Sequence, residues 1–562
     1  MRALYLLRAA GGTFVRRRYR RAAHEFLSCT RSCREIQQQT LQRILHLNAG
    51  SELSRRHQLD GSCSIEEFQS RFPVSEYEFF RPYIERVKQG ETAALLGPEN
   101  RLLMFTLSSG TTSDSKYIPI TAPFLKDYRL GWQSWGILTY DDFPLLKYRN
   151  IVQLTSNYDK FRTPGGTPCG NISGLVAAMQ SPVVKSMYTV PDEVSKIDDP
   201  HQKYYTALRL ALADRHVGML TTANPSTLVY LARFADNEKA SLVRDIADGR
   251  LTGAANMDPQ ILGNLKAKLQ RKHRSRAREL DQIIEQTGHL YPRDFWPGLS
   301  VLAVWTGGSA GAYLPQLKPF YGDLPVRDHG LSASEGRMTI PLASETASGV
   351  LDITSHFFEF VPETEDPLST KQILTADQLE EGQNYFILLT TPSGLYRYHI
   401  CDVVRCTGFY QSTPLIEFLH KGAHISNLTG EKITESQVVT ASRDASAQTS
   451  VEPGQYSVIP QWGEPPCYQF LFEETTALPA ESLTTFLEQF DRLLQESNCE
   501  YAEKRQSGRL APPVPCPLAP GTWSRFTEER QQKPGGSMEQ YKHPCLIPRI
   551  DYAHEIVDRF SR

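Results

Sequence analysis

Residues 107–119 read LSSGTTSDSKYIP, a run of small hydroxyl side chains with one glycine and one lysine between hydrophobic flanks. Backbone N–H groups released by a tight glycine turn, hydroxyl donors and an ammonium group are features that bind a polyphosphate. The residues expected to contact phosphate are Ser108, Ser109, Gly110, Thr111, Thr112 and Lys116. We therefore interpret the stretch as an anion-binding loop that holds the triphosphate of ATP.

The loop lies between two short apolar runs, residues 104–107 and 117–120, which have the extended character of strands. A Walker P-loop has the pattern GxxxxGK[ST] and opens directly into a helix. Here Ser115 precedes Lys116 and Tyr117 follows it, so that pattern is not met. The sequence predicts a tongue between two strands and excludes the Walker alternative.

Composition and charge limit the classes of function. The chain has 562 residues, 40% hydrophobic and 22% charged, which is typical of a globular protein with more than one domain. Its formal net charge is −2, so overall charge predicts no nucleic-acid partner. No run approaches the roughly 20 apolar residues of a membrane helix, so no stable membrane insertion is expected. Ten cysteines without paired zinc-site spacing predict reduced thiols and a cytoplasmic protein.

Two basic segments need an interpretation. Residues 1–24 contain seven arginines and no acid, which would suit a transit peptide or a lipid-binding amphipathic helix. The simpler prediction is a surface helix that continues into residues 34–47 with its positive face in water. Residues 266–278 are also basic and lie within a long helical stretch, residues 258–286. They lack interleaved aromatic residues, which favours a solvated helix face over a nucleic-acid surface.

A second stretch that can carry chemistry is GLSASEG, residues 330–336. A glutamate beside hydroxyl groups and glycine can hold Mg²⁺ that bridges to phosphate oxygens. The Ser-Glu-Gly sequence alone also occurs where a loop caps a helix. We interpret Ser334 and Glu335 as candidate ligands, with Glu335 as the metal ligand.

A third stretch is LYRYHICDVV, residues 395–404, in which Asp402 follows a short extended run. A carboxylate at a turn between strands can accept hydrogen bonds from both hydroxyls of a ribose, each contributing about 1.5–3 kcal/mol. The alternative, an aspartate that binds its own backbone in a turn, is open on these residues alone.

The pattern of elements changes along the chain. From residue 296 onward, short apolar runs alternate with loops rich in glycine and hydroxyl residues, as strand ends that face a ligand often do. From about residue 422 an alternating strand at 468–472 and an amphipathic helix at 482–494 predict a small α+β domain. A hinge is expected near Lys421 and Gly422.

The three stretches, in this order and spacing, resemble the Gretchen Hagen auxin-responsive family of acyl acid amido synthetases, in the version found in bacteria as well as plants. The family belongs to the adenylate-forming superfamily. The resemblance runs from about Gln39 to the C-terminus. It is also carried by the following segments: 82–84 (PYI), 304–309 (VWTGGS), 357–360 (FFEF), 408–410 (GFY), 430–432 (GEK) and 536–544 (GSMEQYKHP).

The resemblance implies an α/β fold. The large N-terminal adenylate-forming domain, residues 1–421, would have β-sheets flanked by helices and a β-barrel element. A smaller hinged α+β domain would span residues 422–562. The implied activity is adenylation of a carboxylic acid with ATP and Mg²⁺, followed by transfer of the acyl group to an amine, most simply an amino acid. The expected partners are these small molecules, and a monomer is expected.

Site roles also follow from the resemblance. Residues 108–112 and Lys116 would bind phosphates, and Thr306, Gly307 and Gly308 would flank the base and the acyl acid. Ser334 would contact the α-phosphate, Glu335 the metal and Asp402 the ribose. Lys542 would be delivered to the site by domain rotation. Lys116, Glu335 and Lys542 are thus the candidate catalytic residues.

The chain departs from the family pattern at five places. Ser113 stands where a loop glycine is usual, and Ser115 where a proline is frequent before the lysine. Leu331 stands where an aromatic residue packs near adenine. Cys401 replaces the glycine before the ribose aspartate, and Lys421 replaces an arginine before the hinge. The retained polar residues favour an active enzyme.

Two alternatives remain open from the sequence. One is an acyl-CoA ligase with the same first step, and the other is a scaffold that keeps the fold without turnover. The acyl acid and the amine are not specified by the sequence. The acid pocket is expected to draw on separated segments near residues 167–174 and 306–313.

Overall fold

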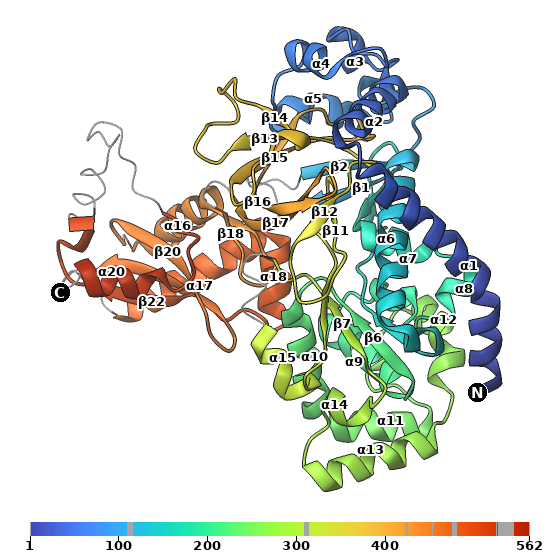
Figure 1. Cartoon of the computed structure of the whole chain (residues 1–562). Helices are drawn as coiled ribbons and strands as arrows, with labels where there is room; N and C mark the ends of the chain where they lie inside the picture. The colour runs from blue at the N-terminus through green and yellow to red at the C-terminus, as the bar shows by residue number, and fades with distance from the viewer. Residues whose placement is uncertain are drawn as a thin grey trace. The chain divides into compact units, whose positions relative to one another are not determined.

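The computed structural model describes two compact units. One comprises residues 1–107 and 117–420, and the other comprises residues 108–116 and 421–562. Figure 1 shows the course of the chain. The residues described are 2–108, 116–307, 314–421, 425–451, 453–474, 480–523, 525–526 and 545–560. None of the described helices is both long and apolar enough to cross a membrane.

A parallel sheet forms one core of the first unit. Its strands, in the order in which they pair, are β3 (Asn150–Gln153), β6 (Val217–Thr221), β7 (Val301–Val304) and β8 (Val326–Asp328). Every residue of β6 and β7 is buried, as expected for strands covered on both faces. The larger helices of this region are α9 (Pro200–Leu212), α10 (Pro225–Asn237), α11 (Lys239–Asp248), α12 (Pro259–Leu269), α13 (Arg274–Thr287) and α15 (Leu314–Tyr321). Helix α10 begins with the Asn224 side chain capping it and proline at its first position, a combination that favours a helix start.

The long helical stretch predicted over residues 258–286 is helical in the structure but interrupted. The chain forms α12 and α13 there, separated by residues 270–273. The N–H of His273 donates to the carbonyl oxygen of Ile246 at 2.9 Å, outside the helical pattern. A tertiary hydrogen bond therefore replaces the continuous helical ladder at this point.

A seven-stranded sheet forms the second core. Its order is β11-β12-β17-β16-β15-β13-β14, and it is antiparallel wherever its register is described. The strands are β11 (Thr339–Ile340), β12 (Gly349–Leu351), β13 (Phe357–Pro362), β14 (Leu374–Thr375), β15 (Asn384–Thr390), β16 (Tyr398–Tyr410) and β17 (Thr413–Lys421). In Figure 1, the early helices lie beside one end of this sheet. They are α2 (Cys33–Asn48), α3 (Glu52–Arg56), α4 (Ile65–Arg71) and α5 (Tyr77–Lys88), and their apolar residues share one buried cluster with the sheet.

The tongue predicted from the sequence has strands on both sides. Strand β1 (Leu102–Ser108) ends at the hydroxyl-rich stretch, and β2 (Lys116–Thr121) begins at Lys116. The two strands are neighbours in a sheet of order β2-β1-β5-β4, with β4 (Phe161–Arg162) and β5 (Pro168–Gly170). Residues 109–115 lie outside the described part of the chain. Helix α6 (Ala122–Asp142) follows β2, and the Thr121 hydroxyl caps its first turn.

The N-terminal segment is a helix, α1 (Arg2–Cys29), and residues 30–32 separate it from α2. It is therefore not continuous with the helix that follows. The guanidinium of Arg20 bonds to the carboxylate of Asp141 near the end of α6, with Nε–Oδ distances of 3.0 Å. Phe26, near the C-terminal end of α1, is buried in an apolar cluster that includes Trp135 of α6. Helix α1 therefore packs against helix α6 of the same unit.

The second unit is built around a three-stranded sheet of order β20-β21-β22. Its elements are β18 (Ile425–Ser426), β19 (Ile433–Thr434), α16 (Glu435–Thr449), β20 (Tyr456–Gln461), β21 (Cys467–Glu473), α17 (Ala480–Ser497), α18 (Cys499–Gln506), β22 (Val514–Leu518) and α20 (Tyr552–Phe560). The apolar stripe predicted for α17 is confirmed, since all of its members are buried: Leu483, Phe486, Leu487, Phe490 and Leu494. They pack with Phe470 of β21 in one core. This unit has the predicted α+β composition.

Candidate functional site

The second motif forms a small hairpin in the first unit. Strands β9 (Ser332–Ala333) and β10 (Gly336–Arg337) pair antiparallel, with Ala333 opposite Gly336. Ser334 and Glu335 therefore form the turn. Glu335 is only 8% exposed, and its carboxylate has no hydrogen-bond or ion-pair partner among the described residues. A buried carboxylate without such a partner is suited to a cation.

The third motif contains a bulge in β16. His399 pairs with Leu388 and Val403 pairs with Phe386, so three residues of β16 lie opposite one residue of β15. The bulge contains Cys401, whose φ of 61° is in the left-handed region, and Asp402, which is buried. Bulges re-aim side chains and are frequent beside active sites. The glycine expected before the aspartate has thus been replaced at a position where the backbone favours glycine.

Tyr398 connects the second and third motifs. Its side chain is buried, and its pKa is raised well above the ordinary value by burial and by the nearby charges of Glu335 and Cys401. The turn of the β9–β10 hairpin and the bulge of β16 therefore lie beside the same phenol, although about 65 residues separate them in the sequence.

Asp328, which the sequence did not single out, joins the end of β7 to the second motif. Its carboxylate accepts hydrogen bonds from the Thr306 N–H at 2.6 Å, the Thr306 hydroxyl at 2.5 Å and the Gly330 N–H at 2.5 Å. Burial raises the pKa of Asp328, while these donors act in the opposite direction. Parallel strands β7 and β8 both end here, which is where α/β sheets bind ligands. Asp328 fixes the turn at Thr306 and Gly307 relative to residues 330–336.

A buried arginine lies behind this turn. Arg337 of β10 donates to the carbonyl oxygen of His329, and its guanidinium lies 4.5 Å from the ring centroid of Trp132 in α6. Burial lowers the pKa of Arg337 to about 10 and that of His329 to about 3, so His329 is neutral at physiological pH. The Trp135 indole donates to the backbone oxygen of Asp328 at 2.7 Å. Helix α6 is thereby tied to the end of β8.

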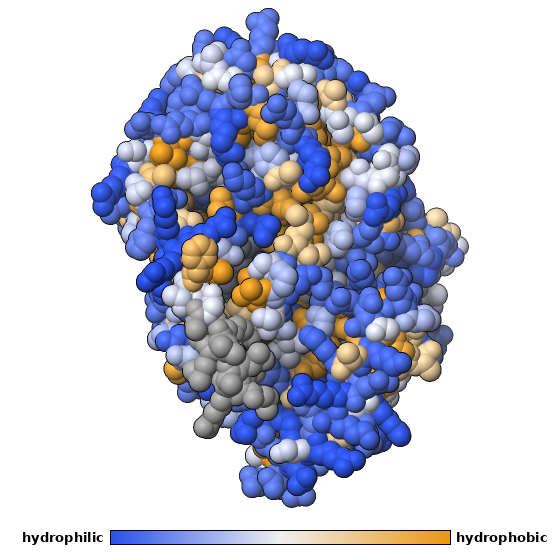
Figure 2. All heavy atoms as spheres, turned by 90° about the vertical axis from the view of Figure 1, so that its right-hand side faces the viewer, coloured by the Kyte–Doolittle hydropathy of each residue, from blue (hydrophilic) through white to orange (hydrophobic). Residues whose placement is uncertain are grey.

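A cavity of about 190 Å³ lies beside α6 in the first unit. Its walls come from α1, α6, α7 (Ile172–Ala178), α8 (Pro182–Lys185) and β6. Most of its lining is apolar or aromatic, including Val15, Tyr19, Trp132, Val176, Met187 and Met219. Figure 2 views the side on which α1 and α8 lie, and hydrophobic surface is visible there among hydrophilic regions.

The charges of this cavity have one sign. Arg16, Arg129 and Lys147 contribute to the lining, and none of the described lining residues is acidic. The expected acid pocket near residues 167–174 and 306–313 corresponds to it in part. Ser173 lines the cavity, whereas the described residues 306 and 307 do not.

Several predicted site residues cannot be placed. Ser109, Gly110, Thr111, Thr112, Gly308 and Lys542 lie outside the described residues. Ser108 is the last residue of β1, and half-buried Lys116 is the first residue of β2. Within the first unit the structure brings Thr306 and Gly307 close to the second motif, and Glu335 close to the bulge that carries Asp402.

The conformation of Cys401 gives a stability prediction. Cys401→Gly is expected to raise the free energy of unfolding by about 0.5–1 kcal/mol, because glycine has no Cβ to strain at positive φ. Cys401→Val is expected to lower it by about 1 kcal/mol, because a β-branched residue is least tolerant there. Urea unfolding of the two variants and the wild type, in the presence of a chelator, measures both changes in the free energy of unfolding. A glycine variant less stable than the wild type would contradict this explanation.

Comparisons with known proteins agree with this fold. The model of the GH3 family N-terminal domain matches residues 22–326, that of the central domain residues 349–421 and that of the C-terminal domain residues 436–549. Indole-3-acetic acid-amido synthetase GH3.3 of Arabidopsis thaliana is 24% identical over 92% of this chain and 90% of its own length. Jasmonoyl--L-amino acid synthetase JAR4 of Nicotiana attenuata is 26% identical over 74% of each chain.

The solved structure of the GH3.15 acyl acid amido synthetase has a TM-score of 0.64 with 21% identity, covering 96% of both chains. This likeness confirms the predicted fold class. The N-terminal domain model alone matches more than half of the 562 residues. GH3 is the Gretchen Hagen auxin-responsive family that the sequence motifs resemble, so that resemblance is confirmed. The chain belongs to the GH3 family.

Proposed function

We propose that this chain is an ATP-dependent acyl acid amido synthetase. It would adenylate a carboxylic acid with release of pyrophosphate and then pass the acyl group to an amine, most simply an amino acid. Family membership and the amido synthetase relatives support this proposal. The observation that carries it is the convergence of the turn at Thr306 with the second motif through Asp328, and of the second motif with the third through Tyr398.

The proposed roles follow the motifs. Residues 108–112 and Lys116 would bind the phosphates of ATP, and the turn at residues 306–308 would flank the base and the acid. Ser334 would contact the α-phosphate and buried Asp402 the ribose. In this assignment, Asp328 is a positioning residue, because it bonds to the Thr306 turn and the Gly330 backbone.

Glu335 fits the role of magnesium ligand. Its carboxylate is buried and has no hydrogen-bond or ion-pair partner among the described residues, so a hard cation would supply the missing partner. A bound Mg²⁺ would neutralise charge that develops on the phosphate oxygens. The protein's own contribution is to hold the carboxylate at the tip of the β9–β10 hairpin.

We propose that the α1–α6 cavity receives the acid. Its apolar and aromatic lining suits an apolar body, and the three basic residues among the lining suit a carboxylate. Helix α1 contributes Gly12, Val15, Arg16 and Tyr19 to one wall, and these residues precede the start of the family match at residue 22. The size limit for the acid would therefore depend in part on a segment outside that match.

Val15 tests this assignment. Val15→Trp is expected to raise KM for the preferred acid at least tenfold, because the indole would fill space beside α6. The neighbouring Phe14 side chain is 78% exposed and does not line the cavity, so Phe14→Trp is the matched control. KM for ATP should be unchanged in both variants. An unchanged KM for the acid in Val15→Trp would remove the cavity from substrate binding.

We also propose that residues 422–562 form a mobile domain that carries Lys542 toward the acyl-adenylate. The division of the chain into compact units between His420 and Lys421 supports this boundary. A cytoplasmic location is proposed as well, because all ten cysteines are free thiols.

A pyrophosphate-release screen tests the function. Carboxylic acids of increasing apolar size are each combined with Mg·ATP and the standard amino acids, and products are identified by mass. Amide, AMP and pyrophosphate are expected. A thioester formed only with coenzyme A would instead support the acyl-CoA ligase. If hydroxylamine yielded no hydroxamate with any of the acids, the alternative of a scaffold without turnover would be supported.

A further inference from the structure

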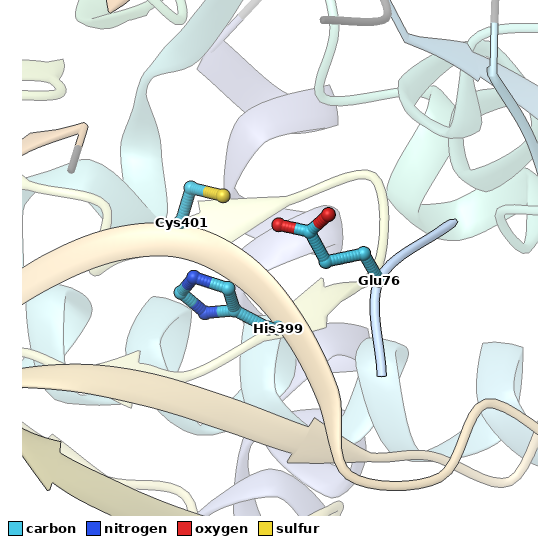
Figure 3. Close-up of side chains that lie close together, drawn as sticks. All are labelled: Glu76, His399 and Cys401. Atoms are coloured by element: carbon cyan, nitrogen blue, oxygen red, sulfur yellow. The ribbon is translucent and has the colours of Figure 1, made fainter. Parts of the chain in front are cut away.

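Three potential metal ligands of different chemistry meet at the surface of the first unit. Glu76 directly precedes α5, and His399 and Cys401 belong to the bulged part of β16. One ligand atom from each of the three lies within 4.8 Å of the others. Figure 3 shows the Glu76 carboxylate and the Cys401 sulfur pointing toward each other, with the imidazole beside them. None of the three has a role in the proposed ligase chemistry.

The backbone holds the two contributing segments together. The N–H of Ser75 donates to the carbonyl oxygen of Arg397 at 3.1 Å, and the N–H of His399 donates to the carbonyl oxygen of Ser75 at 2.9 Å. Glu76 is therefore fixed beside β16 by bonds on the residue before it. The His399 ring also packs nearly perpendicular to the Phe386 ring, at a centroid distance of 5.4 Å. Backbone hydrogen bonds and this ring contact therefore hold the segments that carry the three side chains.

The bulge supplies the third donor. At a φ of 61° Cys401 occupies a conformation that favours glycine, and glycine is what the family pattern has there. A cysteine at this position adds a thiol beside the imidazole and the carboxylate. A strained residue that brings a donor to a cluster is a reason to examine the cluster for function.

We propose that Glu76, His399 and Cys401 bind a zinc-class divalent ion. Thiolate and imidazole select such an ion over Mg²⁺ or Ca²⁺, which prefer oxygen ligands. Tetrahedral zinc with bonds of about 2.0–2.3 Å separates its ligand atoms by about 3.3–3.7 Å, so modest side-chain movement closes the site. Glu76 is exposed and can supply that movement, whereas His399 is only 8% exposed.

Three protein ligands leave a fourth position open to water or to another molecule, as in non-structural zinc sites. The ion would also hold the bulge, since Asp402 follows Cys401 directly. This site is separate in chemistry from the proposed magnesium ligand Glu335. It does not depend on the ligase activity.

Cobalt titration of the full-length, metal-free protein tests the proposal. One Co²⁺ per chain should bind and produce a thiolate-to-cobalt charge-transfer band, which Zn²⁺ abolishes by displacement. Cys401→Gly should lose the band. Loss of folding cannot explain that result, because glycine suits the backbone at residue 401.

Two further variants sharpen the test. Glu76→Gln alters an exposed side chain and should weaken Co²⁺ binding at least tenfold while the band's shape persists. Cys499→Ser, at the exposed cysteine of α18, should leave binding unchanged. Absence of a band in the wild type, or a band of full intensity in Cys401→Gly, would overturn the site.

Discussion

Lys116→Ala should lower acid-dependent ATP–pyrophosphate exchange at least about a hundredfold, or about 2.7 kcal/mol of transition-state stabilisation. In the proposed reaction, negative charge builds on the phosphates while the acid attacks the α-phosphate. A lysine at the end of the hydroxyl-rich loop would stabilise that charge electrostatically. Lys116 begins β2, so its backbone is held by a strand, and in the proposed assignment the residues before it would contact the nucleotide.

Lys126 provides the control for this prediction. It lies on α6, ten residues after Lys116, and its side chain is exposed. Lys126→Ala removes the same charge from the protein and should retain near-normal exchange. Circular dichroism and thermal unfolding of both variants should match the wild type, because neither lysine is buried. Near-normal exchange in Lys116→Ala would remove the loop from the mechanism.

Much of the fold could be predicted because it follows from local patterns. The apolar runs around residues 104–107 and 117–120 became β1 and β2, and the stripe of α17 became the core of the second unit. These features depend on residues a few positions apart, which a linear sequence displays directly. The motifs were found for the same reason.

The remaining features depend on distant pairings. Asp328 ends a three-residue strand, and nothing nearby in the sequence indicates that it bonds to Thr306 and Gly330. The left-handed conformation of Cys401 follows from the register of β15 with β16, which the sequence does not specify. The cavity combines α1 with β6, about two hundred residues apart, so its walls become visible only in the fold.

A buried ion pair at the seven-stranded sheet is hydrogen-bonded to helix α4 and to the residue that follows it. The carboxylate of Glu359 on β13 accepts from Nε of Arg397 at 3.0 and 3.1 Å, and the two side chains are 1% and 3% exposed. The Arg397 guanidinium also donates to the backbone oxygens of Gln69 and Phe72 at 3.0 and 2.6 Å. The amide of Gln69 donates to Glu359 at 2.9 Å. Glu359 is thus the counter-charge at the centre of this network.

Glu359→Ala should therefore lower the free energy of unfolding of the first unit by about 3–5 kcal/mol, because it leaves the Arg397 charge buried without its partner. Glu359→Leu combined with Arg397→Met should restore much of that loss, since removing both charges also removes their desolvation cost. Urea unfolding followed by tryptophan fluorescence is suitable, because four of the six tryptophans lie in this unit: Trp132, Trp135, Trp296 and Trp305.

The pair Arg405–Glu417 is the matched control, with an N–O distance of 3.7 Å and side chains 45% and 25% exposed. Glu417→Ala should change the unfolding free energy by less than about 1 kcal/mol, because water already screens that pair. If Glu359→Ala were as mild as Glu417→Ala, water would have to reach Arg397 in the native state. The conformation of Arg397, with a φ of 45°, would then lack its electrostatic support. Apolar packing and the backbone hydrogen bonds of Ser75 with Arg397 and His399 would hold α4 and α5 to the sheet.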